Sequence, residues 1–403
     1  MCKYEEGYEY YDHEARRFGS FECEEREVKD GLCIFHHPEY WKVHPKEVEE
    51  KFYEKVESAI ENNEDLFCIG YNLPDINLDN KFPKSVYFGF ATFNGEAQFY
   101  YTMFEGKADF SEAKFNGKAN FGVATFNKAD FSGTTFNRQA YFGFATFNGE
   151  AEFFKADFNK AIFSDTTFNG KALFESLRRI KGNSQYGNDP ILDFRHVHFG
   201  NPEEVHFDDF DLGNTSLAYT DVSKIDIGER VRWKANKKLM DERLADKGEV
   251  PYEVVATVYR RLRQNLESKL RYVEAGRFFV AEMEVKRKNV RTKNRVLKWI
   301  RINVFSALAW YKHFSNYGES YKRIILWIAV MLFLPAVVTT ITQVSSLSQF
   351  TSNFQKQLQD YIFAFFQLKT DNIIELAIRI LSLLLMGQLY IALRRQFERK
   401  YKI

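Results

Sequence analysis

Phenylalanine recurs every five or six residues from Phe82 to Phe174, and this ladder restricts the possible fold more than any other feature of the chain. The residue two positions before each ring is usually small, most often alanine. Helical faces recur about every 3.6 residues and strand faces about every 2, so a period near five indicates a coil whose turns stack on one another. The core ladder is predicted to include Phe93, Phe99, Phe104, Phe110, Phe115, Phe121, Phe126, Phe131 and Phe136.

The repeating unit reads Ala91-Thr92-Phe93-Asn94-Gly95 and returns as Ala113-Lys114-Phe115-Asn116-Gly117. This unit resembles that of the pentapeptide-repeat family. The resemblance implies a right-handed quadrilateral β-helix, a solenoid in which four units make one turn and the central ring points inward with the small residue two before it. One ring and one methyl per side would fill a narrow interior, while Asn, Gly, Lys and Asp form solvated turns. A β-sandwich with phenylalanine-rich strands is the alternative.

The β-helix is expected over residues 67–235, with a loop insertion at 176–190 that is rich in Gly, Asn and basic residues. The alternation of five- and six-residue steps predicts one extra residue bulged at alternate corners. A second, broken ladder is expected to form the closing turns, and its members are Phe194, Phe199, Phe207, Leu212, Leu217, Val222 and Ile227. Residues 41–66 are expected to contain a helix that caps the open end of the coil, because apolar residues recur in it at helical spacing.

Residues 1–40 hold three of the four cysteines of the chain, followed closely by histidine. Cys33 and His36 form a C-x-x-H half-site, and Cys2 and Cys23 could complete a tetrahedral site for structural zinc. Unligated cytosolic cysteines are the alternative, and disulfides are not expected on the cytoplasmic side of a membrane. Cys68 is interpreted as a small buried apolar residue.

Two apolar segments, 324–343 and 373–394, are long enough for transmembrane helices. Basic residues flank both segments, in 286–323 and in the tail 395–403, whereas the intervening loop carries only Lys356 and Lys369. The positive-inside rule therefore predicts a two-helix hairpin in the cell membrane with both termini in the cytoplasm. No signal peptide is apparent near the N-terminus, which agrees with that orientation. Buried helices of a soluble domain are the alternative.

Between coil and membrane, residues 250–290 show the apolar spacing of two amphipathic helices and are expected to form a helical hairpin linker. The juxtamembrane segment 291–323 is basic and contains Val296–Tyr311, which is typical of a helix lying among lipid headgroups, although an internal linker helix is an equal alternative. Residues 286–323 carry eleven basic side chains and one acidic side chain, so anionic lipid is the expected partner of this run.

The order of parts in the C-terminal region resembles the two-helix pore module of ion channels. The loop 344–372 then corresponds to a re-entrant segment, with pore-loop candidates at Leu368, Lys369, Thr370, Asp371 and Asn372. A potassium filter needs glycine for its backbone conformation, yet no glycine occurs between Gly318 and Gly387. Selective potassium conduction is therefore not expected.

Enzymatic activity is not expected, because the sequence has no glycine-rich phosphate loop and no nucleophile in a recognisable context. The ladder region from Phe82 to Phe174 contains nine basic and nine acidic residues, so it offers no anionic surface that could imitate DNA. No nucleic-acid partner is expected either, because no base-reading or stacking positions can be identified. We therefore expect a membrane-anchored cytoplasmic scaffold whose coil binds an unknown protein. The alternative is an oligomeric ion or solute channel with a degenerate, glycine-free filter and the coil as its cytoplasmic sensor.

Overall fold

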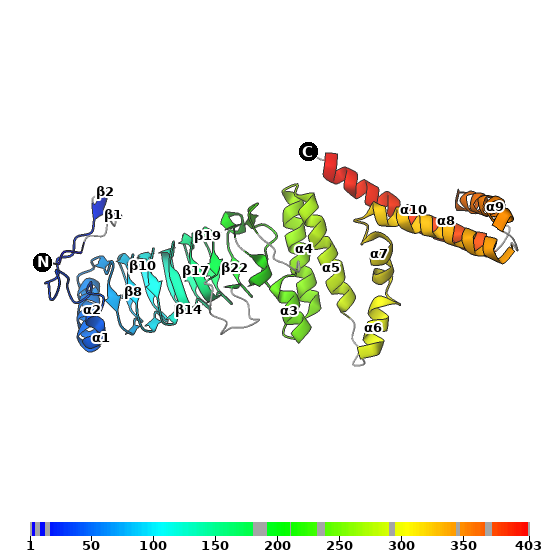
Figure 1. The fold of residues 1–403 in the computed structure, drawn as a ribbon. Helices are drawn as coiled ribbons and strands as arrows, with labels where there is room; N and C mark the ends of the chain where they lie inside the picture. The colour runs from blue at the N-terminus through cyan, green and yellow to red at the C-terminus, as the bar shows by residue number, and fades with distance from the viewer. Residues whose placement is uncertain are drawn as a thin grey trace. The chain divides into compact units, whose positions relative to one another are not determined.

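A computed structural model describes residues 2–4, 9–12, 17–179, 192–209, 211–231, 238–289, 295–343, 347–366 and 373–401. The chain divides into two compact units, Met1–Asn265 and Leu266–Ile403, and each is described by itself. The first unit contains a parallel β-solenoid of about 7 turns, visible in Figure 1 as the stack of short strands that includes those labelled β8 to β22.

The described strands of the solenoid form two parallel sheets, of 12 and 11 strands. The first sheet comprises β3 (Leu66–Phe67), β6 (Lys81–Phe82), β7 (Val86–Tyr87), β10 (Met103–Asp109), β13 (Thr125–Asp130), β15 (Thr146–Phe147), β16 (Ala151–Glu152), β18 (Thr167–Phe168), β19 (Ala172–Glu175), β22 (His198–Phe199), β23 (Val205–Asp208) and β25 (Asp226–Ile227). The second comprises β4 (Asn72–Leu73), β5 (Ile76–Asn77), β8 (Thr92–Phe93), β9 (Ala97–Gln98), β11 (Lys114–Phe115), β12 (Ala119–Asn120), β14 (Thr135–Tyr141), β17 (Asp157–Ile162), β20 (Arg178–Arg179), β21 (Leu192–Asp193) and β24 (Thr215–Ser216).

The phenylalanine ladder fills the interior as the sequence predicts. Equivalent rings pair in register from turn to turn, as Phe93 with Phe115 and Phe115 with Phe136. These rings stack nearly parallel, with centroids 4.4 and 4.9 Å apart. All nine predicted ladder residues are at most 1 % exposed. The members of the second ladder are buried as well, so the coil extends to β25.

The unequal steps of the ladder are absorbed by strand irregularities. The pairing of β10 with β13 shifts register between Phe104 and Lys107, and the pairing of β14 with β17 shifts between Phe136 and Gln139. At these places a six-residue step lies against a five-residue step of the next turn, so one strand carries an extra residue. This arrangement agrees with the bulge that the alternating spacing predicts.

Helices cover both ends of the coil. At the N-terminal end lie α1 (Tyr40–Val43) and α2 (Pro45–Glu61), which pack Phe52 against Phe88 of the coil interior. The short strands β1 (Glu9–Asp12) and β2 (Arg17–Ser20) pair antiparallel before them. At the C-terminal end, α3 (Met240–Lys247) and α4 (Tyr252–Ser268) bind the last turn, where the buried Asp241 accepts hydrogen bonds from the backbone N–H groups of Leu217 and Ala218.

The second unit is helical over its described residues, with α5 (Tyr272–Lys288), α6 (Arg295–Asn303), α7 (Ala307–Ser315), α8 (Tyr321–Gln343), α9 (Leu347–Phe366) and α10 (Ile373–Tyr401). By length and composition, two described segments could cross a membrane, Tyr321–Gln343 and Ile373–Phe397. Helices α8, α9 and α10 pack together around Ala336, Tyr361, Phe365 and Ile378.

Three details of the second unit differ from the sequence predictions. The expected loop 344–372 contains the helix α9, because its apolar residues recur at helical spacing and pack on α8 and α10. The expected tail after residue 394 continues α10 to Tyr401. The expected headgroup helix Val296–Tyr311 is two helices, since α6 ends at Asn303 and α7 begins after Ser306.

Candidate metal centre and surface of the coil

Three thiols and one imidazole meet beside the first turn of the coil. Cys2, Cys23, Cys33 and His36 are all buried, and each offers one ligand atom, with all four atoms within 4.8 Å of one another. The Sγ atoms of Cys23 and Cys33 are 3.8 Å apart, and the Nδ1 atom of His36 lies 3.4 Å from Cys2 Sγ and 3.1 Å from Cys33 Sγ. The structure therefore brings together all four residues that the sequence singled out.

The backbone of the coil orients the imidazole of this cluster. His36 Nε2 lies 2.8 Å from the carbonyl oxygen of Ile69, which can only accept a hydrogen bond, so Nε2 carries a proton and Nδ1 faces the thiols. The Tyr4 ring stacks on the His36 imidazole, with ring centroids 3.8 Å apart. The N–H of Cys33 donates to Cys2 Sγ at 3.4 Å. These contacts fix ligand orientation before any ion is considered.

The thiols differ in their acidity. Hydrogen bonding from the Cys23 thiol, helped by His36, lowers the pKa of Cys33 to about 4, and the same pairing together with burial raises the pKa of Cys23 well above its usual range. The hydrogen bonds to Cys33 therefore favour the thiolate form of its sulfur. Thiolates are the form in which cysteine binds metals.

The donor set and its dimensions fit a tetrahedral ion such as Zn²⁺. Metal–sulfur bonds of about 2.3 Å in a tetrahedron place the sulfurs about 3.8 Å apart, close to the observed Cys23–Cys33 separation. Cys68, the fourth cysteine, is fully buried elsewhere in the coil wall, where burial raises the pKa of its thiol. It is not part of the cluster.

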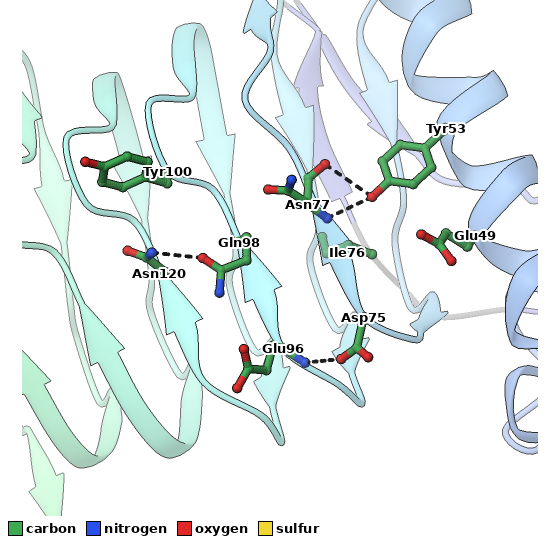
Figure 2. Close-up of a pocket in the computed structure, with 9 residues that line it drawn as sticks. All are labelled: Glu49, Tyr53, Asp75, Ile76, Asn77, Glu96, Gln98, Tyr100 and Asn120. Atoms are coloured by element: carbon green, nitrogen blue, oxygen red, sulfur yellow. Dashed lines mark hydrogen bonds between the residues drawn. The ribbon is translucent and has the colours of Figure 1, made fainter.

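A groove of about 640 Å³ runs between α2 and the first turns of the coil (Figure 2). Within it, the Tyr53 hydroxyl donates to the carbonyl of Asn77 at 3.2 Å and accepts the N–H of the same residue at 2.8 Å. Asn120 donates to Gln98 at 2.8 Å, one turn apart. These polar groups hold the cap to the coil and one turn to the next, and the groove carries no nucleophile beside a base among its lining residues.

The coil has two kinds of corner. At one kind, asparagine and glycine stack from turn to turn, as in Asn116 donating to Asn94 at 3.3 Å and Asn137 donating to Asn116 at 2.9 Å. At the other kind the chain turns through a residue with positive φ, and such residues recur about every half turn. One column of these tight corners, which we call the aromatic column, consists of Tyr101, Val123, Phe144, Asp165, His196 and Tyr219.

Large side chains of the aromatic column point into solvent. Tyr101 is 59 % exposed and Phe144 is 58 % exposed, with φ angles of 62° and 60°. Further along the column, His196 and Tyr219 stack with centroids 4.3 Å apart. Half a turn away, the opposite column is Phe90, Glu112, Gly133, Lys155 and Ser176, and it is more polar. The two sides of the solenoid therefore differ in surface chemistry.

The pore-loop candidates Leu368, Lys369, Thr370, Asp371 and Asn372 lie outside the described residues. The neighbouring helix α9 makes polar contacts with α8, where the Tyr361 hydroxyl lies 3.3 Å from Thr339 Oγ1 and Gln357 donates to Gln343 at 3.2 Å. The guanidinium of Arg379 in α10 donates to the carbonyl of Phe365 at 2.8 Å.

Sequence reasoning missed the aromatic column and the polar cap at Asp241. The column has a sequence signal, because Tyr101, Val123 and Phe144 each follow a ladder phenylalanine by two residues. At this position every other unit of the ladder from Phe82 to Phe174 has glycine or a polar residue, except for Phe90. That signal does not say which corners are tight. Asp241 has no local signal, since its partners are backbone groups more than twenty residues away.

Comparison with known proteins agrees with this fold. Residues 99–143 match the family model of pentapeptide repeats (9 copies). The matched segment lies in the middle of the solenoid, so the coil is a pentapeptide-repeat β-solenoid, followed by helices of which two are apolar enough to span a membrane. The chain thus contains pentapeptide repeats, and its solenoid together with the two apolar helices fits a membrane-associated repeat protein.

A similar relative is an uncharacterised protein of Methanocaldococcus jannaschii, with 30 % identity over 157 residues. The match covers 37 % of this chain and 32 % of the relative, so the chain spans about a third of the length of the curated protein it matches. No solved structure matches the chain significantly.

Proposed function

We propose that the protein is a membrane-anchored scaffold whose coil binds a partner protein through the aromatic column. The observation that carries this proposal is the exposure of Tyr101 and Phe144 at positive φ. Positive φ recurs in both columns, so what distinguishes the aromatic column is the greater exposure of large rings at its corners. Exposed aromatic rings on a rigid support are also typical of protein-binding surfaces, since they bury much apolar area with little loss of side-chain freedom.

The anchoring part of the proposal rests on α8 and α10. Arg395, near the end of α10, donates to the carbonyl of Tyr317 at 2.8 Å and lies 3.3 Å from Glu319, just before α8 begins. The start of α8 and the end of α10 are therefore adjacent, as in a hairpin that enters and leaves on one side. Basic residues flank both ends, which favours the cytoplasmic side for the termini.

A site-specific cross-linking experiment tests the scaffold. A photoreactive phenylalanine analogue at Phe144 in the full chain, in its native membrane, is expected to trap a defined partner, and Tyr101→Ser should reduce that adduct. The matched control places the analogue at Lys155, which has the same positive φ on the opposite column. Equal adducts from both positions, or none from Phe144, would contradict the proposal. Ion flux through liposomes that disappears when residues 357–372 are replaced by a Gly/Ser linker would favour the channel instead.

We also propose that Cys2, Cys23, Cys33 and His36 hold a structural zinc ion. When bound, the ion would tie the N-terminal arm to the coil, because its ligands come from three separate segments and the imidazole is already anchored on Ile69. Elemental analysis of the full chain, purified without chelator, should find one zinc per chain. Cys33→Ser should lose the metal and Cys68→Ser should retain it. Protein without metal, or metal retained by Cys33→Ser, would contradict this assignment.

A further inference from the structure

We propose that the pocket between α5, the start of α8 and the end of α10 binds the phosphate headgroup of an anionic phospholipid. The pocket has a volume of about 500 Å³, and its lining residues are Val273, Glu319, Ser320, Tyr321, Lys322, Ala392 and Gln396. This inference rests on the proposed membrane anchoring, because it gives the anchored protein a preference among lipids.

The depth of the pocket matches the headgroup layer. Lys322 and Arg323 directly precede the apolar run of α8, which begins at Ile324. The indole Nε1 of Trp327 donates to the carbonyl of His313 at 3.1 Å, so α7 is fixed against the first turns of α8. Trp310 of α7 is 54 % exposed, as is common for tryptophan at the boundary between lipid and water. The pocket therefore opens where lipid phosphates lie.

The charge inside the pocket suits a phosphate group. Lys322 is exposed, and no salt bridge engages its ammonium group within the described part of the chain. The one acidic group in the lining, Glu319, lies 3.3 Å from the guanidinium of Arg395, which neutralises it. Two of the lining residues, Tyr321 and Lys322, belong to the first turn of a 23-residue helix, whose N-terminal dipole also favours an anion.

The rest of the pocket suits a lipid more than a soluble phosphate. Val273 and Ala392 give part of the wall an apolar surface, and the exposed leucine and isoleucine side chains of α8 and α10 continue from it into the span. The hydroxyls of Ser320 and Tyr321 and the amide of Gln396 can donate to phosphate oxygens. Basic pockets between helices on the cytoplasmic side are a recognised mode of binding acidic headgroups.

Lipid binding to the full chain in a zwitterionic detergent tests this site. Native mass spectrometry with added phosphatidylglycerol or phosphatidylcholine of equal chain length should show a preference for phosphatidylglycerol. Lys322→Gln is expected to weaken phosphatidylglycerol binding about fivefold and leave phosphatidylcholine binding unchanged. Lys322→Arg should preserve the preference. The matched control is Lys356→Gln, an exposed lysine on α9 outside the pocket, which should change neither lipid.

Several outcomes would overturn the assignment. They are an unchanged preference in Lys322→Gln, an equal loss in Lys356→Gln, or full competition by soluble glycerol 3-phosphate, which would make the ligand a free phosphate compound. Alkaline extraction of native membranes separates this inference from the anchoring on which it rests. Protein that resists extraction but shows no lipid preference contradicts only the pocket, whereas protein that is extracted contradicts the membrane anchor itself.

Discussion

Replacing one ring in the middle of the coil should open the solenoid locally and at high cost. Phe131 is fully buried and stacks between Phe110 and Phe153, with both centroid distances 5.1 Å. Truncating a buried phenylalanine to alanine costs about 3–5 kcal/mol, and each aromatic pair contributes about 0.5–1.5 kcal/mol beyond area burial. Because Phe131 loses two stacked partners, we expect Phe131→Ala to fall at the upper end, about 4–5 kcal/mol.

An end position of the ladder provides the comparison. Phe82 is 2 % exposed, and among the described residues its ring stacks on Phe104 alone, at 5.5 Å. Phe82→Ala should therefore cost about 0.5–1.5 kcal/mol less than the central substitution. A solenoid turn contacts only its neighbours, so the loss in Phe131→Ala should be concentrated in the adjacent turns.

Hydrogen exchange with mass spectrometry on the full chain in detergent measures this effect segment by segment. Amides of β13 to β16 should exchange roughly a thousandfold faster in Phe131→Ala, the factor that corresponds to about 4 kcal/mol. Strands near the ends of the coil should change much less. Protection lost evenly along the coil, or a cost for Phe131→Ala no greater than for Phe82→Ala, would refute the reasoning from stacked rings.

Three further predictions concern other parts of the chain. Burial raises the pKa of Asp241 to about 6, above its usual value of 3.8. The folded state therefore binds more protons than the unfolded state in this window, and stability should fall by about 2 kcal/mol as pH rises from 4 to 6. Denaturant unfolding at several pH values measures this change in the free energy of unfolding. In Asp241→Asn the decrease between pH 4 and 6 should be absent. Arg395→Gln removes a hydrogen bond to the carbonyl of Tyr317 and a cation–π contact with the ring of Phe279 at 4.5 Å. Hydrogen exchange at the end of α10 should therefore report a loss of about 1–3 kcal/mol in local stability. Arg395→Lys should restore only part of this loss. In Gly117→Ala the new methyl would lie 2.0 Å from the carbonyl oxygen of Gly95, whereas in Gly200→Ala its nearest neighbour would be 3.2 Å away. Thermal unfolding should therefore show a larger loss of stability for Gly117→Ala than for Gly200→Ala.

The candidate metal centre illustrates how far residue types alone can lead. The C-x-x-H spacing at Cys33 and His36 and the two other N-terminal cysteines were sufficient to choose four residues. Their meeting depends on the coil, because His36 is oriented by the carbonyl of Ile69, and Cys2 is held by the N–H of Cys33. Long-range contacts of this kind have no trace in local spacing.

The helical region contains helices that the sequence predicts and one that it does not. Apolar periodicity predicted α4, α5 and α8 close to their observed bounds, and also the start of α10, since a helix that buries one face repeats its pattern locally. It missed α3, an eight-residue helix with acidic residues in its buried face. Of those residues, Asp241 is buried because the open end of the coil offers backbone N–H groups that need acceptors, and Glu242 accepts a hydrogen bond from the Tyr259 hydroxyl.

The sequence alone specifies the solenoid, because a five- to six-residue period of large and small apolar residues can fill a narrow interior only when successive turns stack in register. It also determined the two apolar spans, whose length and composition are local properties. Two features depend on tertiary contacts and cannot be read from the sequence. The first is which corners turn tightly and present Tyr101 and Phe144 to solvent, and the second is which segments enclose the pocket beside Lys322. Every corner of the coil has nearly the same spacing in the sequence, so these differences arise from contacts between turns and between helices that lie far apart along the chain.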